Sequence, residues 1–286
     1  MGKCKYCHRD AGWFQHSHSE CEKKYNDGKL KLRNILMSCF SNLQDFYCRE
    51  QEINEIISSS YIDEATKEKI FVDVLDDVIE KYLEDNIIND AEKQSVARFI
   101  QFSQIPQAIL NQHHSIEKML QADVIQDILN GNKPSPKITI AGNFPFMLSR
   151  NETMIWLFRD IIFYEQKIKR EYVGRSSGIS VRVAKGIYYR TGGFRGHPVE
   201  TTYMQRISVG SVCLTDKHIY FSSPEKSFRL SFDKIINIDT YSNGVGLQKD
   251  GANSKPIFLE GINSWFVYNV IMNLRHYSHI HAISTK

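Results

Sequence analysis

The strongest constraint on how this chain folds lies at its N-terminus, where Cys4, Cys7, His18 and Cys21 follow the spacing C-x2-C, ten residues, H-x2-C. Each such pair can hold a metal ion from one turn, and two pairs complete the tetrahedron that zinc prefers. A segment this small buries too little surface to fold alone, so bound metal would supply most of its stability. The pattern therefore predicts a zinc knuckle over residues 1–28, with these four side chains as the Zn²⁺ ligands.

Other residues of the same segment compete for the metal ion. His8 and His16 lie within reach, and either could replace His18, although only His18 forms a regular pair with Cys21. The alternative to a metal site is a set of cytosolic cysteines that lie close together by coincidence. Four protein ligands would leave zinc no open position for water, so the pattern predicts a structural site without hydrolytic chemistry.

The composition is that of an ordinary globular protein. The 286 residues are 42% hydrophobic and 24% charged, and the chain is long enough for two domains beside the knuckle. The formal net charge is only +3, so overall charge does not predict nucleic-acid binding. The remaining cysteines, Cys39, Cys48 and Cys213, have apolar neighbours typical of buried free thiols, which indicates a reducing cytosol. No apolar run approaches a membrane span, so we expect a cytoplasmic protein without a transmembrane segment.

The residues after Cys21 have the periodicity of helices. Apolar residues recur at spacings of three and four, which predicts an all-helical domain over residues 29–131. Asn89 or Asp90 is expected to cap one helix at its N-terminus, and a further helix is predicted over residues 116–129.

A change of period predicts a second domain over residues 150–280. Two prolines open the segment 132–149, which is predicted to be a linker. One more amphipathic helix is predicted over residues 151–169, and the glycine-rich stretch 191–198 is predicted to be a loop between strands. Short β-branched or aromatic runs separated by turn residues predict antiparallel strands. These runs span residues 179–189, 211–215, 218–222, 227–232, 235–241, 245–249 and 257–259.

The C-terminal domain ends in a predicted helix over residues 264–275. An apolar stripe begins just before this helix and continues along it. The stripe consists of Ile262, Phe266, Val270 and Leu274, backed by Val267 and Ile271. Because the helix directly follows an antiparallel sheet, we expect the stripe to pack against that sheet. We therefore expect these side chains to be structural.

Two sequence runs resemble a known family. GISVRVAKGIYYR at residues 178–190 and VGSVCLTDKHIYF at 209–221, followed by FDKIINI at 232–238, are similar to bacterial pleckstrin-homology (PH) or GRAM-like domains. The resemblance covers about residues 150–280 and implies an antiparallel β-barrel closed by the C-terminal helix. His218 stands where the family usually has arginine, which weakens any assignment of anion binding there. The fold class expected is α+β and multidomain, with a zinc knuckle, a helical middle and a PH/GRAM-like barrel capped by a helix.

The helical block from about residue 50 to 125 is similar to the TerB-like domains of tellurite-resistance and phage-conflict proteins. The resemblance rests on LEDNIINDAE at residues 83–92. In those domains an acidic turn before a helix is associated with metal ions. Here Asn86 and Asn89 occupy two turn positions, so fewer carboxylates are present than a calcium-type loop needs. We expect these acids to form a solvated helix face and to favour the helix N-terminus.

No catalytic motif is recognisable. The sequence contains no G-x-S-x-G, P-loop, H-E-x-x-H or G-x-G-x-x-G pattern. The pair His113-His114 and the C-terminal His276, His279 and His281 have no evident carboxylate partner nearby in the sequence. We therefore expect no enzymatic activity.

A local concentration of positive charge begins at Lys167. Eight basic residues occur from Lys167 to Arg195 inclusive, whereas the neighbouring acids are Glu165 and Glu171. Interleaved tyrosines and glycines would suit a phosphate-bearing partner. The candidate anion-binding residues are Arg175, Arg182, Lys185 and Arg190. The alternative is that side chains alternate along each strand and the charged ones simply face solvent.

These features indicate a non-enzymatic zinc-binding adaptor or sensor that recognises a protein partner or an anionic ligand. The resemblances suggest a setting in a bacterial stress or phage-defence system. One alternative is a nucleic-acid-binding protein in which the knuckle and the basic face of the barrel bind phosphates. An anionic lipid head group is a further candidate ligand. Another alternative is a defence effector with cryptic catalysis.

Overall fold

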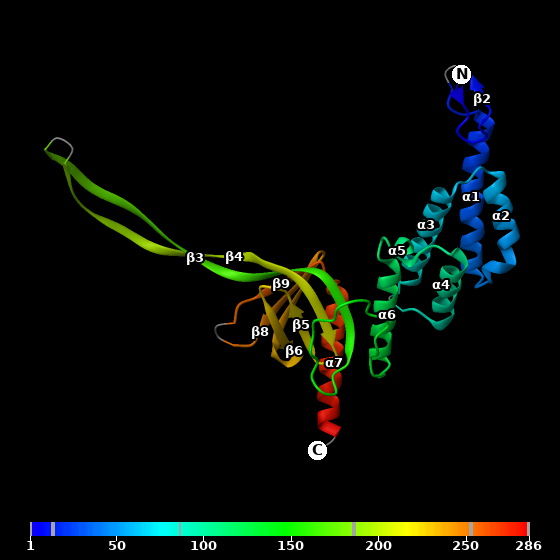
Figure 1. The fold of residues 1–286 in the computed structure, drawn as a ribbon. Coiled ribbons are helices and arrows are strands. Elements are labelled where there is room, and N and C mark those ends of the chain that lie inside the picture. Colours follow the sequence, from blue (N-terminus) through cyan, green and yellow to red (C-terminus); the bar gives the residue numbers. More distant parts are fainter. Residues whose placement is uncertain (1, 13–14, 86, 185–186, 252–253, 285–286) are drawn as a thin grey trace. The chain divides into compact units, whose positions relative to one another are not determined.

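A computed structural model describes residues 2–12, 15–85, 87–184, 187–251 and 254–284, with side chains described outside 171–199 and 276–284. The chain forms two compact units, Met1–Asn130 and Gly131–Lys286, which are treated separately below (Figure 1). Among the described residues, no helix is both long and apolar enough to cross a membrane.

Unit 1 begins with a two-stranded sheet and continues as helices. The strands are β1 (Gly2–Lys3) and β2 (Asp10–Gly12). The helices are α1 (Ser19–Ser41), the 3-10 helix η1 (Phe46–Arg49), α2 (Glu50–Ser59), α3 (Glu64–Tyr82), α4 (Asp90–Ser103), α5 (Gln107–Leu110) and α6 (Ser115–Leu129). The predicted helical character of this region is thereby confirmed.

Four phenylalanine rings from four of these segments form the centre of unit 1. Phe99 of α4 lies 5.0 Å from Phe40, 5.1 Å from Phe46 and 5.4 Å from Phe71 between ring centroids. All four side chains are buried. Burial of this much aromatic surface is the main force that holds short helices together.

The start of α4 is fixed by a capping box. The Asn89 side chain accepts a hydrogen bond from the Glu92 N–H at 3.0 Å, and the Glu92 carboxylate accepts one from the Asn89 N–H at 3.0 Å. Of the two predicted caps, Asn89 is therefore the one used. Asn86 of the same turn lies outside the described residues, and the described acids of this turn belong to no metal-holding group.

Two of the three cysteines outside the knuckle are buried, as expected. Cys39 and Cys213 have no exposed surface. Cys48 is exposed, so its expected burial is wrong. It lies in the short helix η1, whose buried residue is Phe46, two positions earlier.

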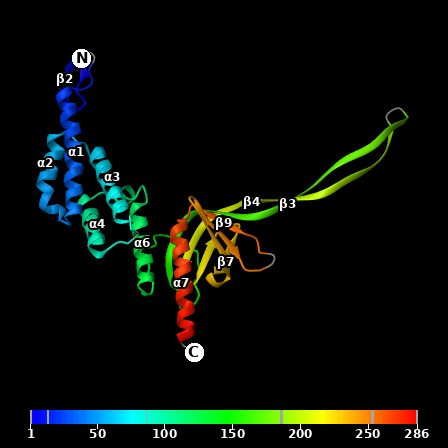
Figure 2. The ribbon, with the colours of Figure 1, turned by 180° about the vertical axis from the view of Figure 1, so that it is seen from behind.

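Unit 2 is built on a seven-stranded antiparallel sheet in the order β6-β5-β4-β3-β9-β8-β7. The strands are β3 (Met154–Ala184), β4 (Ile187–Thr215), β5 (His218–Ser222), β6 (Ser227–Ser231), β7 (Ile235–Tyr241), β8 (Gly244–Lys249) and β9 (Ile257–Glu260). β3 and β9 pair with each other, so the first and last strands join two meanders into one curled sheet. Figure 2 shows α7 (Ser264–Ser284) running beside this sheet.

The helix predicted over residues 151–169 is wrong, because this segment lies in β3. Ile155, Phe158 and Ile161 are all buried at a spacing of three, which imitates helical periodicity. The spacing coincides with two irregularities in the pairing of β3 with β4, one between Met154 and Trp156 and one between Phe158 and Ile161, where Asp160 has a positive φ of 57°. Beyond it the period returns to two, as Ile161 and Phe163 are buried and Ile162 is not.

The predicted loop over residues 191–198 is also wrong, since these residues belong to β4 and pair with β3. Gly192 lies opposite Gly178, and Gly196 lies opposite Gly174. Glycines that indicate a loop in the sequence therefore face other glycines across a ladder. The run 179–189, predicted as one strand, is divided between the end of β3 and the start of β4 (Figure 1).

The stripe on the last helix is buried as predicted. Ile262, Phe266, Val270 and Leu274 are at most 8% exposed, and Val267 and Ile271 are fully buried. Phe266 meets Trp156 of β3 edge-on, with ring centroids 5.4 Å apart and planes at 69°. These contacts attach α7 to the inner face of the sheet.

The buried carboxylate of Glu152, in the segment before β3, forms hydrogen bonds with residues of β4 and β5. Glu152 accepts hydrogen bonds from the Thr215 hydroxyl at 2.5 Å, the Tyr220 hydroxyl at 2.7 Å and the Ser149 N–H at 2.9 Å. His218 Nδ1 lies 2.8 Å from the same carboxylate. Thus His218, at the position where the resembling family has arginine, is engaged by an acid inside the domain.

We expect Glu152 to make the stability of unit 2 depend on acid pH. Burial alone raises its pKa, but hydrogen bonds from Thr215, Tyr220, Ser149 and His218 outweigh burial and lower the pKa from 4.5 to about 2. A carboxyl with a lowered folded-state pKa stabilises the fold above its unfolded pKa and loses this contribution as the pH falls. The free energy of unfolding should therefore fall by about 3 kcal/mol as the pH is lowered from 4.5 to about 2.

The measurement is urea unfolding of unit 2, followed at several pH values for wild type and Glu152→Gln. The variant should be less stable at pH 7, and its stability should fall less steeply between pH 4.5 and 2. Glu225→Gln, which removes an exposed carboxyl in the turn after β5, is the matched control and should follow wild type. Equal acid dependence in Glu152→Gln and wild type would contradict the assignment.

Candidate metal centre

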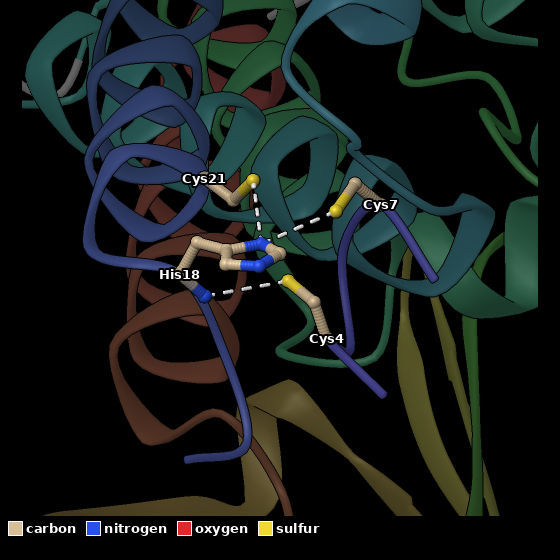
Figure 3. A group of neighbouring side chains, drawn as sticks. All are labelled: Cys4, Cys7, His18 and Cys21. Carbon is tan, nitrogen blue, oxygen red and sulfur yellow. Dashed lines mark hydrogen bonds between the residues drawn. The ribbon is translucent and has the colours of Figure 1, made fainter. Parts of the chain in front are cut away.

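The four predicted ligands come from two adjacent turns of unit 1. Cys4 and Cys7 lie in the turn between β1 and β2, where the His8 N–H donates to the Cys4 carbonyl at 2.9 Å. His18 is the N-cap residue of α1, and Cys21 lies in its first turn. One ligand atom from each residue lies within 4.8 Å of all the others, and Figure 3 shows the four side chains converging.

The distances between ligand atoms suit a tetrahedral ion. Zinc–sulfur and zinc–nitrogen bonds of about 2.3 and 2.0 Å imply a sulfur-to-nitrogen separation of about 3.5 Å. His18 Nδ1 lies 3.4 Å from Cys7 Sγ and 3.7 Å from Cys21 Sγ. Three thiols and one imidazole form a donor set that zinc favours over calcium or magnesium. This group can therefore hold a metal ion of the zinc type.

His18 is oriented by a bond on the far side of its ring. Its Nε2 lies 2.9 Å from the Asp10 carbonyl oxygen, which can only accept a hydrogen bond. With the proton on Nε2, the lone pair of Nδ1 faces the three sulfurs. His8 and His16 are exposed and do not belong to the group that the structure brings together.

The surroundings of Cys4 and Cys21 favour the binding of a cation. Burial raises the pKa of Cys4, but hydrogen bonds from the backbone at Cys7, His18 and Tyr6 outweigh it and lower the pKa to about 6. The His18 N–H donates to Cys4 Sγ at 3.4 Å. Burial and the neighbouring Cys7 and Cys4 raise the pKa of Cys21, because thiolates crowd one another when no cation lies between them. A divalent ion would relieve this repulsion.

The knuckle packs on the helices through tyrosines that the sequence pattern did not single out. The rings of Tyr6 and Tyr25 lie 4.8 Å apart, and Tyr61 lies 6.4 Å from Tyr6. The Tyr25 hydroxyl is 2.9 Å from that of Thr66, near the start of α3. Tyr25 and Thr66 are 41 positions apart in the chain, and Tyr6 and Tyr61 are still farther apart, so no local signal could reveal these contacts.

The candidate anion-binding residues lie where side chains are not described. Lys185 is outside the described residues altogether. The backbone of β3 places Arg175 opposite Arg195, and Arg182 opposite Tyr188, while Arg190 of β4 lies opposite Ser180. The register thus pairs the two strands that carry the basic residues.

Two histidines have carboxylate partners that the sequence did not reveal, which corrects the expectation that none lies nearby. His113 Nδ1 lies 2.5 Å from Asp76 Oδ2, and His114 Nδ1 lies 2.9 Å from Glu117. Glu117 is three positions along the chain and could have been found, whereas Asp76 is 37 positions away. Both histidine side chains are more than half exposed. The side chains of the C-terminal histidines 276, 279 and 281 are outside the described set.

Comparisons of the chain with protein-family models, with curated proteins and with solved structures found no significant match. The metal-binding group and the fold of unit 2 are therefore the features of this chain that bear on its function.

Proposed function

We propose that this chain is a zinc-stabilised adaptor or sensor that acts by binding a partner and not by catalysis. The observation that carries the proposal is the convergence of Cys4, Cys7, His18 and Cys21 within 4.8 Å. Four protein ligands satisfy zinc completely, so the ion would hold structure together and would have no position for a reacting water. Its role would be to keep the knuckle folded against the helices.

The second part of the proposal assigns unit 2 to the PH/GRAM-like domains. Support comes from the antiparallel order of the sheet, from the pairing of β3 with β9, and from the buried stripe that attaches α7. The sequence resemblance implies an antiparallel β-barrel closed by a C-terminal helix. The suggested stress or defence setting rests on the resemblance of residues 83–92 alone.

The third part concerns the long ribbon of β3 and β4, which we propose binds an anionic partner. β9 pairs with β3 at residues 162–165, and β5 pairs with β4 at residues 211–214. Beyond these stretches, toward the tip of the ribbon, β3 and β4 are each other's partners. A two-stranded ribbon is marginally stable by itself. The register places Arg175 opposite Arg195, so the proposed anion would meet two basic residues at one position of the ribbon.

Binding to the ribbon should weaken steeply with salt, since screening and counterion release both act on such contacts. We expect full-length protein to bind acidic liposomes or nucleic acid at low salt. Reversing two charges, Arg175→Glu and Arg190→Glu, should abolish this binding, whereas Lys31→Glu on α1 of unit 1 should not. Fluorescence anisotropy and liposome sedimentation provide the measurements. Absence of binding to both probes at low salt would leave the arginines as solvated strand residues.

Nucleic-acid binding is the second candidate function, and the ribbon register favours it. Arg182 lies opposite Tyr188, and the next pairs along the ladder are Val181 with Tyr189 and Ser180 with Arg190. Basic and aromatic residues at neighbouring positions of a ribbon suit phosphates and stacked bases. A preference for single-stranded nucleic acid over acidic liposomes in the experiment above would select this function.

A further inference from the structure

Unit 2 has a hollow of about 670 Å³ on β3, β7, β8 and β9 that the proposed function does not use. In β9, Ile257, Phe258 and Glu260 line the hollow, and of these Phe258 and Glu260 are the less buried, whereas Leu259 is buried and does not line it. Its volume falls in the range of small-molecule sites. The hollow is therefore a surface feature of the sheet separate from the packing of α7.

Gly246 of β8 lines the hollow beside aromatic rings. A Cβ atom at this position would come within 3.2 Å of the Tyr241 ring. The Tyr241 and Phe258 rings meet edge to face, with centroids 5.4 Å apart and planes at 89°. The Tyr164 ring lies 5.9 Å from Phe258. Three aromatic rings thus lie together at this site.

The charged residues of the lining are both acids. Asp239 and Glu260 line the hollow, and no lysine, arginine or histidine is among its described lining residues. Asn237 donates to Asp239 at 3.0 Å, and Asn243 donates to Glu260 at 3.3 Å. The Tyr164 hydroxyl donates to Glu260 at 2.6 Å, which raises the pKa of Tyr164. Both carboxylates are thus oriented by their neighbours and retain lone pairs for a ligand.

We propose that this hollow binds the alkylated ammonium group of a small organic cation. Aromatic faces attract such cations through the ring quadrupole, and nearby carboxylates add a Coulomb attraction. Among the described residues, Asp239 and Glu260 belong to no group that could hold a metal ion. Arg206, the register partner of Tyr164 on β4, interacts with that tyrosine but does not line the hollow.

Choline chloride and its neutral carbon analogue, 3,3-dimethyl-1-butanol, test the proposal on the full-length protein. The two probes have nearly the same shape, so titration calorimetry or ligand-detected NMR isolates the effect of charge. Choline should bind about tenfold more tightly than the alcohol, since a cation–π contact and a carboxylate both require the charge. Trimethyllysine, used as a free amino acid, distinguishes a choline-like from a lysine-like source of the ammonium group.

Substitutions then locate the site. Asp239→Asn and Tyr241→Leu should each weaken choline binding by about threefold to thirtyfold, whereas Tyr241→Phe should retain it. Asp233→Asn removes an equally exposed charge outside the hollow and should bind as wild type does. Thermal melting checks that each variant is folded. Failure of choline to bind wild type, equal binding of the alcohol, or equal weakening by Asp233→Asn would overturn the proposal.

Discussion

Changing Cys7 to serine should release one zinc ion per chain and loosen residues 2–28, while unit 2 keeps its fold. The serine oxygen is a poor zinc ligand, and loss of one thiolate from a four-ligand site removes most of a binding free energy of about 10–16 kcal/mol. Since unit 2 is a separate compact unit, its sheet does not depend on the knuckle. Purified wild-type protein should contain about one zinc per chain by elemental analysis.

Hydrogen exchange provides the second measurement for this variant. Amides of β1, β2 and the start of α1 should exchange faster in Cys7→Ser, because Tyr6 would lose its fixed position against Tyr25. Cys48→Ser changes an exposed thiol outside the metal-binding group and should retain the zinc. A metal-free wild type with a protected N-terminal segment would rule out the zinc centre.

Replacing Phe266 by alanine should destabilise unit 2 by about 3–5 kcal/mol, the range for truncating a buried aromatic side chain. Phe266 is fully buried and contacts Trp156 and Phe158 of β3. The cavity would therefore open where α7 is attached to the sheet. Such a loss is a large part of the stability of a typical domain. Urea unfolding followed by tryptophan fluorescence measures it.

Met272→Ala, on the exposed side of the same helix, is the matched control. Met272 is 43% exposed, so the substitution should cost less than about 1 kcal/mol. Should Phe266→Ala unfold like wild type and lose a partner instead, α7 would be a docking helix and not part of the core.

The sequence by itself determined the features whose signals are local. The spacing of Cys4, Cys7, His18 and Cys21 restricts the ligands to two short turns, which fold together in the structure. Asn89 caps α4 through a residue three positions away. The predicted bounds of β5 and β7 match the structure because turn residues and period-two patterns surround them.

Tertiary structure alone decided the features that depend on distant partners. Irregular pairing at two points near the start of β3, one of them at Asp160, gives this strand a helix-like spacing of apolar residues, and only its pairing with β4 shows the segment to be a strand. Glu152 meets Thr215, 63 positions away, and His113 meets Asp76 across 37 positions. Such contacts are made by the packing of elements and not by neighbouring residues, so the amino-acid pattern around each partner carries no sign of the other.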